Sequence, residues 1–123
     1  MGDGCRIKEL PDGGKEFVLE DRALSFVRID DRATLGFGRT EVAIGGPFVL
    51  RIGGVTHALD PGRRDTLGAL LTLYPGTVRW LWASPDGRLA AVFEDGALVT
   101  VDPSPAVIAW SVGNVANLPG APR

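Results

Sequence analysis

The chain has 123 residues, of which 45% are hydrophobic and 23% charged, and its formal net charge is −2 at neutral pH. This length suits one domain with a hydrophobic core. The weak acidic balance argues against a nucleic-acid-binding protein and against a polybasic membrane-surface protein, because both depend on clustered Lys and Arg. With Cys5 as the only cysteine and His57 as the only histidine, the sequence allows no internal disulfide and lacks the common zinc motifs.

The first residues contain no apolar core of signal-peptide length, and no window approaches a transmembrane span. We therefore expect a cytoplasmic protein. No glycine-rich loop precedes a predicted helix, so the sequence predicts no nucleotide or other cofactor.

Residues 1–21 are interpreted as a flexible N-terminal arm, and residues 22–123 as a single β-rich domain. The turn signal Pro11–Gly14 leaves open a hairpin that pairs Arg6–Leu10 with Glu16–Leu19.

Short runs of alternating apolar residues separated by turn residues predict five strands in the first half of the domain. These predicted strands are Leu24–Ile29, Ala33–Phe37, Thr40–Ile44, Phe48–Ile52 and Val55–Leu59. The last two flank Gly53-Gly54, which suits a two-residue hairpin turn because glycine tolerates positive φ. That turn would place Ile52 opposite Val55 and Leu50 opposite His57.

A helix is expected over residues 61–74, between the two halves. Asp60-Pro61 resembles a helix start, and Pro75-Gly76 resembles an end. Its apolar stripe would consist of Leu67, Leu70, Leu71 and Tyr74, which follow α-helical spacing.

The second half predicts three strands joined by Asp-Gly turns and then a last hairpin. These strands are Thr77–Ala83, Arg88–Phe93, Leu98–Val101, Val107–Val112 and Val115–Leu118.

A shift of 56 positions aligns residues 22–47 with residues 78–103, which indicates an internal repeat of a three-stranded meander. Each meander alone would leave an apolar face exposed to water. The predicted fold is therefore mainly β (α+β): two antiparallel meanders packed as a sandwich or a small barrel, with one helix between them.

Trp80 and Trp82 are candidate contact residues for a protein partner or a ligand, since tryptophan is favoured in binding hot spots. They are predicted to share a strand face with Val78. The alternative is core packing, which we favour because Leu24 and Phe26 align with the two tryptophans in the repeat.

Three other residues are candidate contacts. Trp110 lies in a shorter apolar run, and Arg63 and Arg64 open the predicted helix, where the helix dipole disfavours positive charge. His57 is expected to be a structural histidine at a sheet rim. The aspartates at 30, 31, 86 and 95 stand where tight turns favour Asp, so we interpret them as turn residues rather than as catalytic or metal-binding carboxylates.

The order of motifs resembles a family of small proteins of unknown function that occurs in actinobacteria and related bacteria. The resemblance spans roughly residues 24–120, and its end is shorter and less glycine-rich than in the family. The residues that carry it are Asp60-Pro61, Pro75-Gly76, Asp86-Gly87-Arg88-Leu89, Phe93, Asp95-Gly96, Leu98, Val101, Pro103 and Ala109-Trp110. It implies no catalytic residues. The general appearance is similar to that of immunity proteins, which neutralise secreted bacterial toxins.

These observations favour a non-enzymatic protein-interaction module, with an immunity-type inhibitor of a bacterial toxin as one form of it and a homodimer as a further possibility. The alternative is a small-ligand-binding β domain, with an aromatic pocket between the two repeats lined by Trp80, Trp82, Trp110 and Tyr74.

Overall fold

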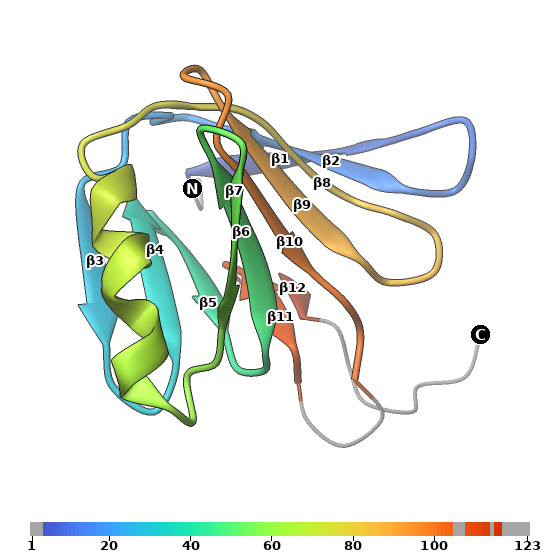
Figure 1. Cartoon of the computed structure of the whole chain (residues 1–123). Helices are drawn as coiled ribbons and strands as arrows, with labels where there is room; N and C mark the ends of the chain where they lie inside the picture. Colours follow the sequence, from blue (N-terminus) through green and yellow to red (C-terminus); the bar gives the residue numbers. More distant parts are fainter. Residues whose placement is uncertain (1–3, 105–107, 114, 117–123) are drawn as a thin grey trace.

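The computed structural model describes residues 4–104, 108–113 and 115–116, which form two antiparallel sheets packed as a sandwich (Figure 1). The strand orders are β1-β2-β8-β9-β10-β6-β7 in the seven-stranded sheet and β12-β11-β5-β4-β3 in the five-stranded sheet. The predicted mainly β fold is thus confirmed, as a sandwich rather than a barrel, because neither sheet closes on itself.

The seven-stranded sheet consists of β1 (Cys5–Glu9), β2 (Lys15–Leu19), β6 (Phe48–Ile52), β7 (Val55–Leu59), β8 (Val78–Ala83), β9 (Leu89–Phe93) and β10 (Leu98–Val101). The five-stranded sheet consists of β3 (Phe26–Ile29), β4 (Ala33–Phe37), β5 (Thr40–Ile44), β11 (Trp110–Val112) and β12 (Val115–Ala116). The predicted last hairpin is present as β11 and β12; its positions 107, 114, 117 and 118 lie outside the described residues.

One hydrophobic core fills the space between the sheets, because each strand alternates and turns its apolar side chains inward. Two aromatic contacts join the sheets across this core. The Phe37 and Phe93 ring centroids lie 6.4 Å apart, and the Phe17 and Trp110 rings meet edge-to-face at 6.1 Å. Such pairs add to the stabilisation that burial alone provides.

The β6–β7 hairpin confirms the register predicted from its glycines. Gly53 and Gly54 have φ values of +58° and +81°, and Ile52 pairs with Val55 and Leu50 with His57. β7 is the edge strand of its sheet, so the half-buried His57 lies at the sheet rim, as expected.

The helix between the two halves is a 3₁₀-helix, η1 (Arg64–Leu73), so the predicted α-helical stripe is wrong in detail. Three residues per turn place Leu67, Leu70 and Leu73 on one buried face. Leu71 and Tyr74, which α-helical spacing assigned to that face, are 55% and 53% exposed.

The helix start also differs from the prediction. The Asp60 carboxylate accepts a hydrogen bond from the Gly62 amide at 2.9 Å in the preceding turn, and the residue before η1 is Arg63. The helix contacts β7 and β3, which are the edge strands of the two sheets. It therefore covers one open side of the sandwich (Figure 1).

The interpretation of residues 1–21 as an arm outside the domain is wrong for residues 5–19. These residues form the β1–β2 hairpin, and Glu16 of β2 pairs with Trp82 of β8. The hairpin turn is held by the Asp12 carboxylate, which accepts a hydrogen bond from the Gly14 amide at 2.9 Å. The hairpin alternative that the turn signal left open is the one observed.

The two predicted meanders are present as β3-β4-β5 in one sheet and β8-β9-β10 in the other. Their common origin by duplication stays a prediction. The turn before β9 is longer than the turn before β4, so the strand register differs from the sequence alignment. Trp80 takes the position of Phe26, and Trp82 takes that of Arg28.

Candidate functional site

The outer face of the seven-stranded sheet carries several large apolar side chains. Alternation turns the residues between the core positions outward, and Trp80 is 50% exposed. We call this surface the apolar outer face; its residues are Val18, Val49, Trp80, Trp82, Val92 and Leu98. Trp80 pairs with Val92 and Val92 with Leu98, so these side chains form a continuous row.

A β-bulge in β8 directs the two tryptophans outward. Val78 pairs with Phe93 and Trp80 with Val92, so Arg79 is an extra residue in β8. Val78 is therefore buried, while Trp80 and Trp82 lie on the opposite face. The interpretation of the tryptophans as core residues that share a face with Val78 is wrong for this reason.

An open groove of about 250 Å³ lies at one end of this face, where β2 meets β8. Trp80, Trp82, Leu10 and Glu16 line it, and nearly all of its exposed lining is apolar. Glu16 lies directly opposite Trp82 in the register and completes the lining. The two indole rings provide a site for an apolar group, and an indole face also attracts a cation.

Positive charge surrounds the groove and the face. The Arg79 guanidinium lies 5.6 Å from the Trp80 ring centroid, which is the distance of a cation–π contact. Arg6 and Lys8 lie on the neighbouring β1, and Arg51 lies on β6. In the described part of the chain, none of these four cations forms an ion pair with an acidic side chain.

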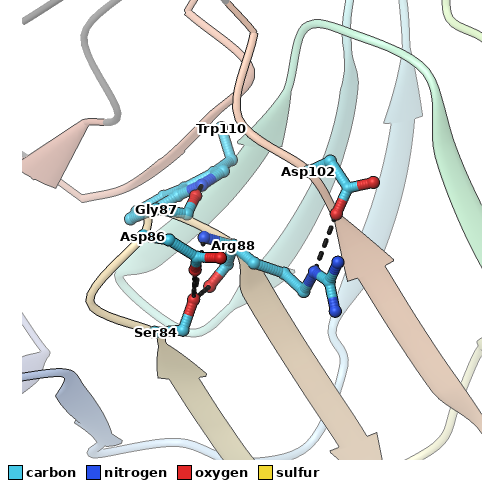
Figure 2. Close-up of polar contacts among 6 residues, drawn as sticks. All are labelled: Ser84, Asp86, Gly87, Arg88, Asp102 and Trp110. Atoms are coloured by element: carbon cyan, nitrogen blue, oxygen red, sulfur yellow. Dashed lines mark hydrogen bonds and ion pairs between the residues drawn. The ribbon is translucent and has the colours of Figure 1, made fainter. Parts of the chain in front are cut away.

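A polar cluster at the β8–β9 turn is the most extensive side-chain network near this sheet, and Figure 2 shows it. The Ser84 hydroxyl donates to the Asp86 carboxylate and accepts from the Arg88 amide at 3.1 Å. Arg88 Nε donates to the Asp102 carboxylate at 2.7 Å. The hydrogen bond from Ser84 is the main cause that lowers the pKa of Asp86, with smaller contributions from Arg88.

This cluster has the character of a turn rather than of a catalytic site. A carboxylate whose pKa is lowered is a weak base, so Asp86 is poorly suited to activate the Ser84 hydroxyl. The network fixes the turn, and the turn's Gly87 carbonyl accepts the indole hydrogen bond of Trp110 at 2.8 Å (Figure 2).

Trp110 belongs to the core. Its side chain is 4% exposed, packs against Phe17, and ties β11 of one sheet to the β8–β9 turn of the other through Gly87. Trp110 lies inside the core, whereas Trp80 and Trp82 line an outer groove, so these three tryptophans do not line one pocket together.

The remaining candidates do not join the groove. Arg63 and Arg64 are exposed at the start of η1, which contacts β7 at the opposite edge of the sheet from β2. Tyr74 directly follows η1.

Asp30 and Asp95 act as turn residues, as predicted. Asp30 accepts from the Arg32 amide and Asp95 from the Ala97 amide, each at 2.9 Å. The hydrogen bond from the Arg32 amide is the main cause that lowers the pKa of Asp30.

Among residues 4–104, 108–113 and 115–116, no group of three or more His, Cys, Asp and Glu side chains is arranged to hold a metal ion. No helix in the same residues is long and apolar enough to cross a membrane.

Leu10 and Glu16 are the groove residues that sequence reasoning missed, because the first 21 residues were assigned to an arm. The signal that identifies them is the alternation of Glu16, Phe17, Val18 and Leu19 directly after the turn at Pro11–Gly14.

The sequence model of DUF6188, a family of unknown function, matches residues 16–119, so the chain belongs to this family. No curated protein and no solved structure matches the chain.

Proposed function

We propose that the chain is a protein-interaction module whose contact surface is the apolar outer face of the seven-stranded sheet. The observation that carries this proposal is the outward orientation of Trp80 and Trp82 on a sheet that has a complete core on its other face. Neither tryptophan is needed to close that core, and exposed apolar surface is unfavourable in water unless a partner covers it.

The composition of the face supports a protein partner. Tryptophan and arginine are the residues most enriched in binding hot spots, and the face combines Trp80 and Trp82 with Arg51 and Arg79. The aliphatic residues Val49, Val92 and Leu98 extend the apolar surface over three further strands. A partner with apolar side chains at its centre would cover these residues.

The size of the groove argues against a small organic ligand as the main partner. Ligand pockets usually enclose about 300–1,000 Å³ and surround most of the ligand. The groove measures about 250 Å³ and is open on one side. It therefore suits one side chain of a partner protein better than a whole cofactor or metabolite.

Site-specific photo-cross-linking in cells tests the proposal. A photoreactive phenylalanine analogue replaces Val92 at the centre of the apolar outer face, and in a matched control it replaces Ser111 on the outer face of the other sheet. We expect protein adducts from position 92 and far fewer from position 111. Equal yields at the two positions, or no adduct at position 92, would overturn the proposal.

The adduct from position 92 also identifies the partner by its mass and peptides. A secreted bacterial toxin is one partner that we consider, from the general similarity to immunity proteins. A toxin-derived peptide in the adduct would support a toxin as the partner. Recovery of an unrelated protein would overturn the toxin as the partner.

A further inference from the structure

We infer that one partner of the apolar outer face is the same face of a second copy of the chain, with Arg51 of each copy seated in the groove of the other. This inference rests on the proposed function and names the partner. It follows from the arrangement of charge and apolar surface around the middle strand.

The strand order gives the face an internal symmetry. β9 is the fourth of seven strands, with β8 and β10 beside it and β2 and β6 two strands away. Consider two copies that pack face to face about a twofold axis parallel to β9. β9 then lies over β9, β8 over β10, and β2 over β6.

That arrangement places opposite charges together. Glu16 projects outward from β2, and Arg51 projects outward from β6. In the register, Arg51 pairs with Leu98 and Leu98 pairs with Val92, so these residues form one row across the strands. Glu16 and Trp82 pair in the next row on the same face, two residues further along the strands. Neighbouring rows on one face are about 7 Å apart, which an extended arginine side chain spans. Each copy supplies one Glu16 and one Arg51, so the contact forms twice.

The groove suits a guanidinium group. Arginine recognition favours the faces of indole rings together with a carboxylate. Trp80 and Trp82 line the groove, and Glu16 lies at its edge, directly opposite Trp82 in the register. Within this chain the Arg79 guanidinium already lies over the Trp80 ring. Neither Arg51 nor Glu16 forms an ion pair in the described part of its own chain, although Lys8 lies directly opposite Glu16 on β1. Arg51 of the second copy would therefore compete with Lys8 for the Glu16 carboxylate.

The centre of the interface would be apolar. Trp80 and Val92 of one copy would lie against Leu98 and Val92 of the other, because β8 faces β10 and β9 faces β9. Aligned twisted sheets pack in this way inside sandwich domains. We expect a dimer that forms reversibly as the concentration rises.

Charge reversal tests the pairing, with the mass in solution measured by analytical ultracentrifugation over a wide range of concentrations. We expect the wild-type chain to shift from monomer to dimer. Glu16→Arg and Arg51→Glu each place like charges together twice, and each should weaken dimerisation about tenfold or more. The double variant Glu16→Arg/Arg51→Glu restores opposite charges and should regain most of the wild-type affinity.

A mixture of the two single variants is a further test. In the mixed dimer the arginine introduced at position 16 of one copy meets the glutamate introduced at position 51 of the other. The second contact keeps the native pair of Arg51 and Glu16. The mixed dimer should therefore form where neither variant alone dimerises.

Arg64→Glu serves as the control, because Arg64 is exposed at the start of η1, away from the face. It should leave dimerisation unchanged. A wild-type chain that stays monomeric at millimolar concentration would overturn the inference, and so would a double variant or a mixture no better than the single variants.

The cross-linking experiment separates this inference from the proposed function. An adduct at position 92 with twice the mass of the chain supports the dimer. Adducts only with other proteins would overturn the dimer and support the interaction module. The absence of any adduct at that position would count against both.

Discussion

The two outer faces of the sandwich differ in how they meet water. On the five-stranded sheet the outward positions of the inner strands hold the small residues Thr34, Gly36, Ala43 and Ser111, together with one charged residue, Glu41. The Phe26 ring lies across Gly36, where an added Cβ would be only 2.0 Å from the ring. On the seven-stranded sheet the outward positions hold Trp80, Trp82, Val92 and Leu98 instead.

The two outer faces also differ in how their charged side chains are paired. Over the small face, Arg28 lies 5.7 Å from the Phe26 ring centroid and forms an ion pair with Glu41 at 3.2 Å. Over the apolar outer face, Arg51 and Glu16 form no ion pair within the described part of the chain. Charged side chains over the first face therefore pair with one another within the chain. The second leaves apolar surface and charge available for another molecule.

The largest expected effect separates a core tryptophan from a surface tryptophan. Trp110→Ala removes a buried ring and its hydrogen bond to Gly87, and should lower the free energy of unfolding by about 3–5 kcal/mol. Trp80→Ala removes a half-exposed ring and should cost less than about 1 kcal/mol. Urea denaturation measures both. Similar losses would contradict the placement of Trp80 on an outer face.

A second prediction concerns the small face. Gly36→Ala places a Cβ against the Phe26 ring, so the ring must move, and we expect a loss of about 1–3 kcal/mol. Gly68→Ala is the matched control, because nothing lies within 4 Å of a Cβ at this exposed position in η1. Its effect should stay within about 1 kcal/mol. If Gly36→Ala were as mild as the control in thermal denaturation, Phe26 would not cover Gly36.

A third prediction concerns a substitution that should stabilise the protein. Thr34 is buried on β4, and its hydroxyl has no hydrogen-bond partner among the residues that the structure describes. Thr34→Val keeps the shape of the side chain and removes the unsatisfied group, so it should stabilise the protein by about 1 kcal/mol. Thr56→Val on the exposed edge strand β7 is the control, because water can hydrate the Thr56 hydroxyl. A destabilised Thr34→Val variant in urea denaturation would indicate that this hydroxyl contributes to stability.

The smallest expected effect is a dependence on pH. The Arg32 amide, with a smaller contribution from Arg28, lowers the pKa of Asp30 below its ordinary value of 3.8. A carboxyl group with a lowered pKa stabilises the fold at pH values above its ordinary pKa. This contribution is lost as the pH falls below about 4 and through the pKa of the group in the folded state. Asp30→Asn should flatten the acid side of the stability profile slightly. An unchanged profile would show that Asp30 contributes nothing to acid sensitivity.

The sequence predicts local turn geometry well in this chain. Gly53-Gly54 identifies both the β6–β7 hairpin and its register, because few residues other than glycine tolerate the positive φ of a two-residue turn. The turns at Asp30 and Asp95 are identified for a similar reason, since an aspartate side chain satisfies a nearby amide.

The orientation of the tryptophans could not be predicted in the same way. The bulge at Arg79 reverses which residues of β8 face the core, and no residue type in Val78–Trp82 specifies a bulge. A one-residue change in register moves every later side chain to the other face. The candidate site therefore depends on a tertiary feature, although its residues Trp80 and Trp82 were identified as candidates.

The helix type was missed for a related reason. Leucines at 67, 70, 71 and 73 fit either helical period, and packing against the two sheet edges selects the period of three.

The most direct test of the account is an amide NMR titration in which the protein is diluted from millimolar to micromolar concentration. We predict that chemical shifts change at Trp80, Trp82, Val92 and Leu98, and at the side-chain indole of Trp82, while Thr34, Ala43 and Ser111 stay constant. Changes centred on the five-stranded sheet would contradict the assignment of the contact face. Spectra that do not change with concentration would contradict the dimer.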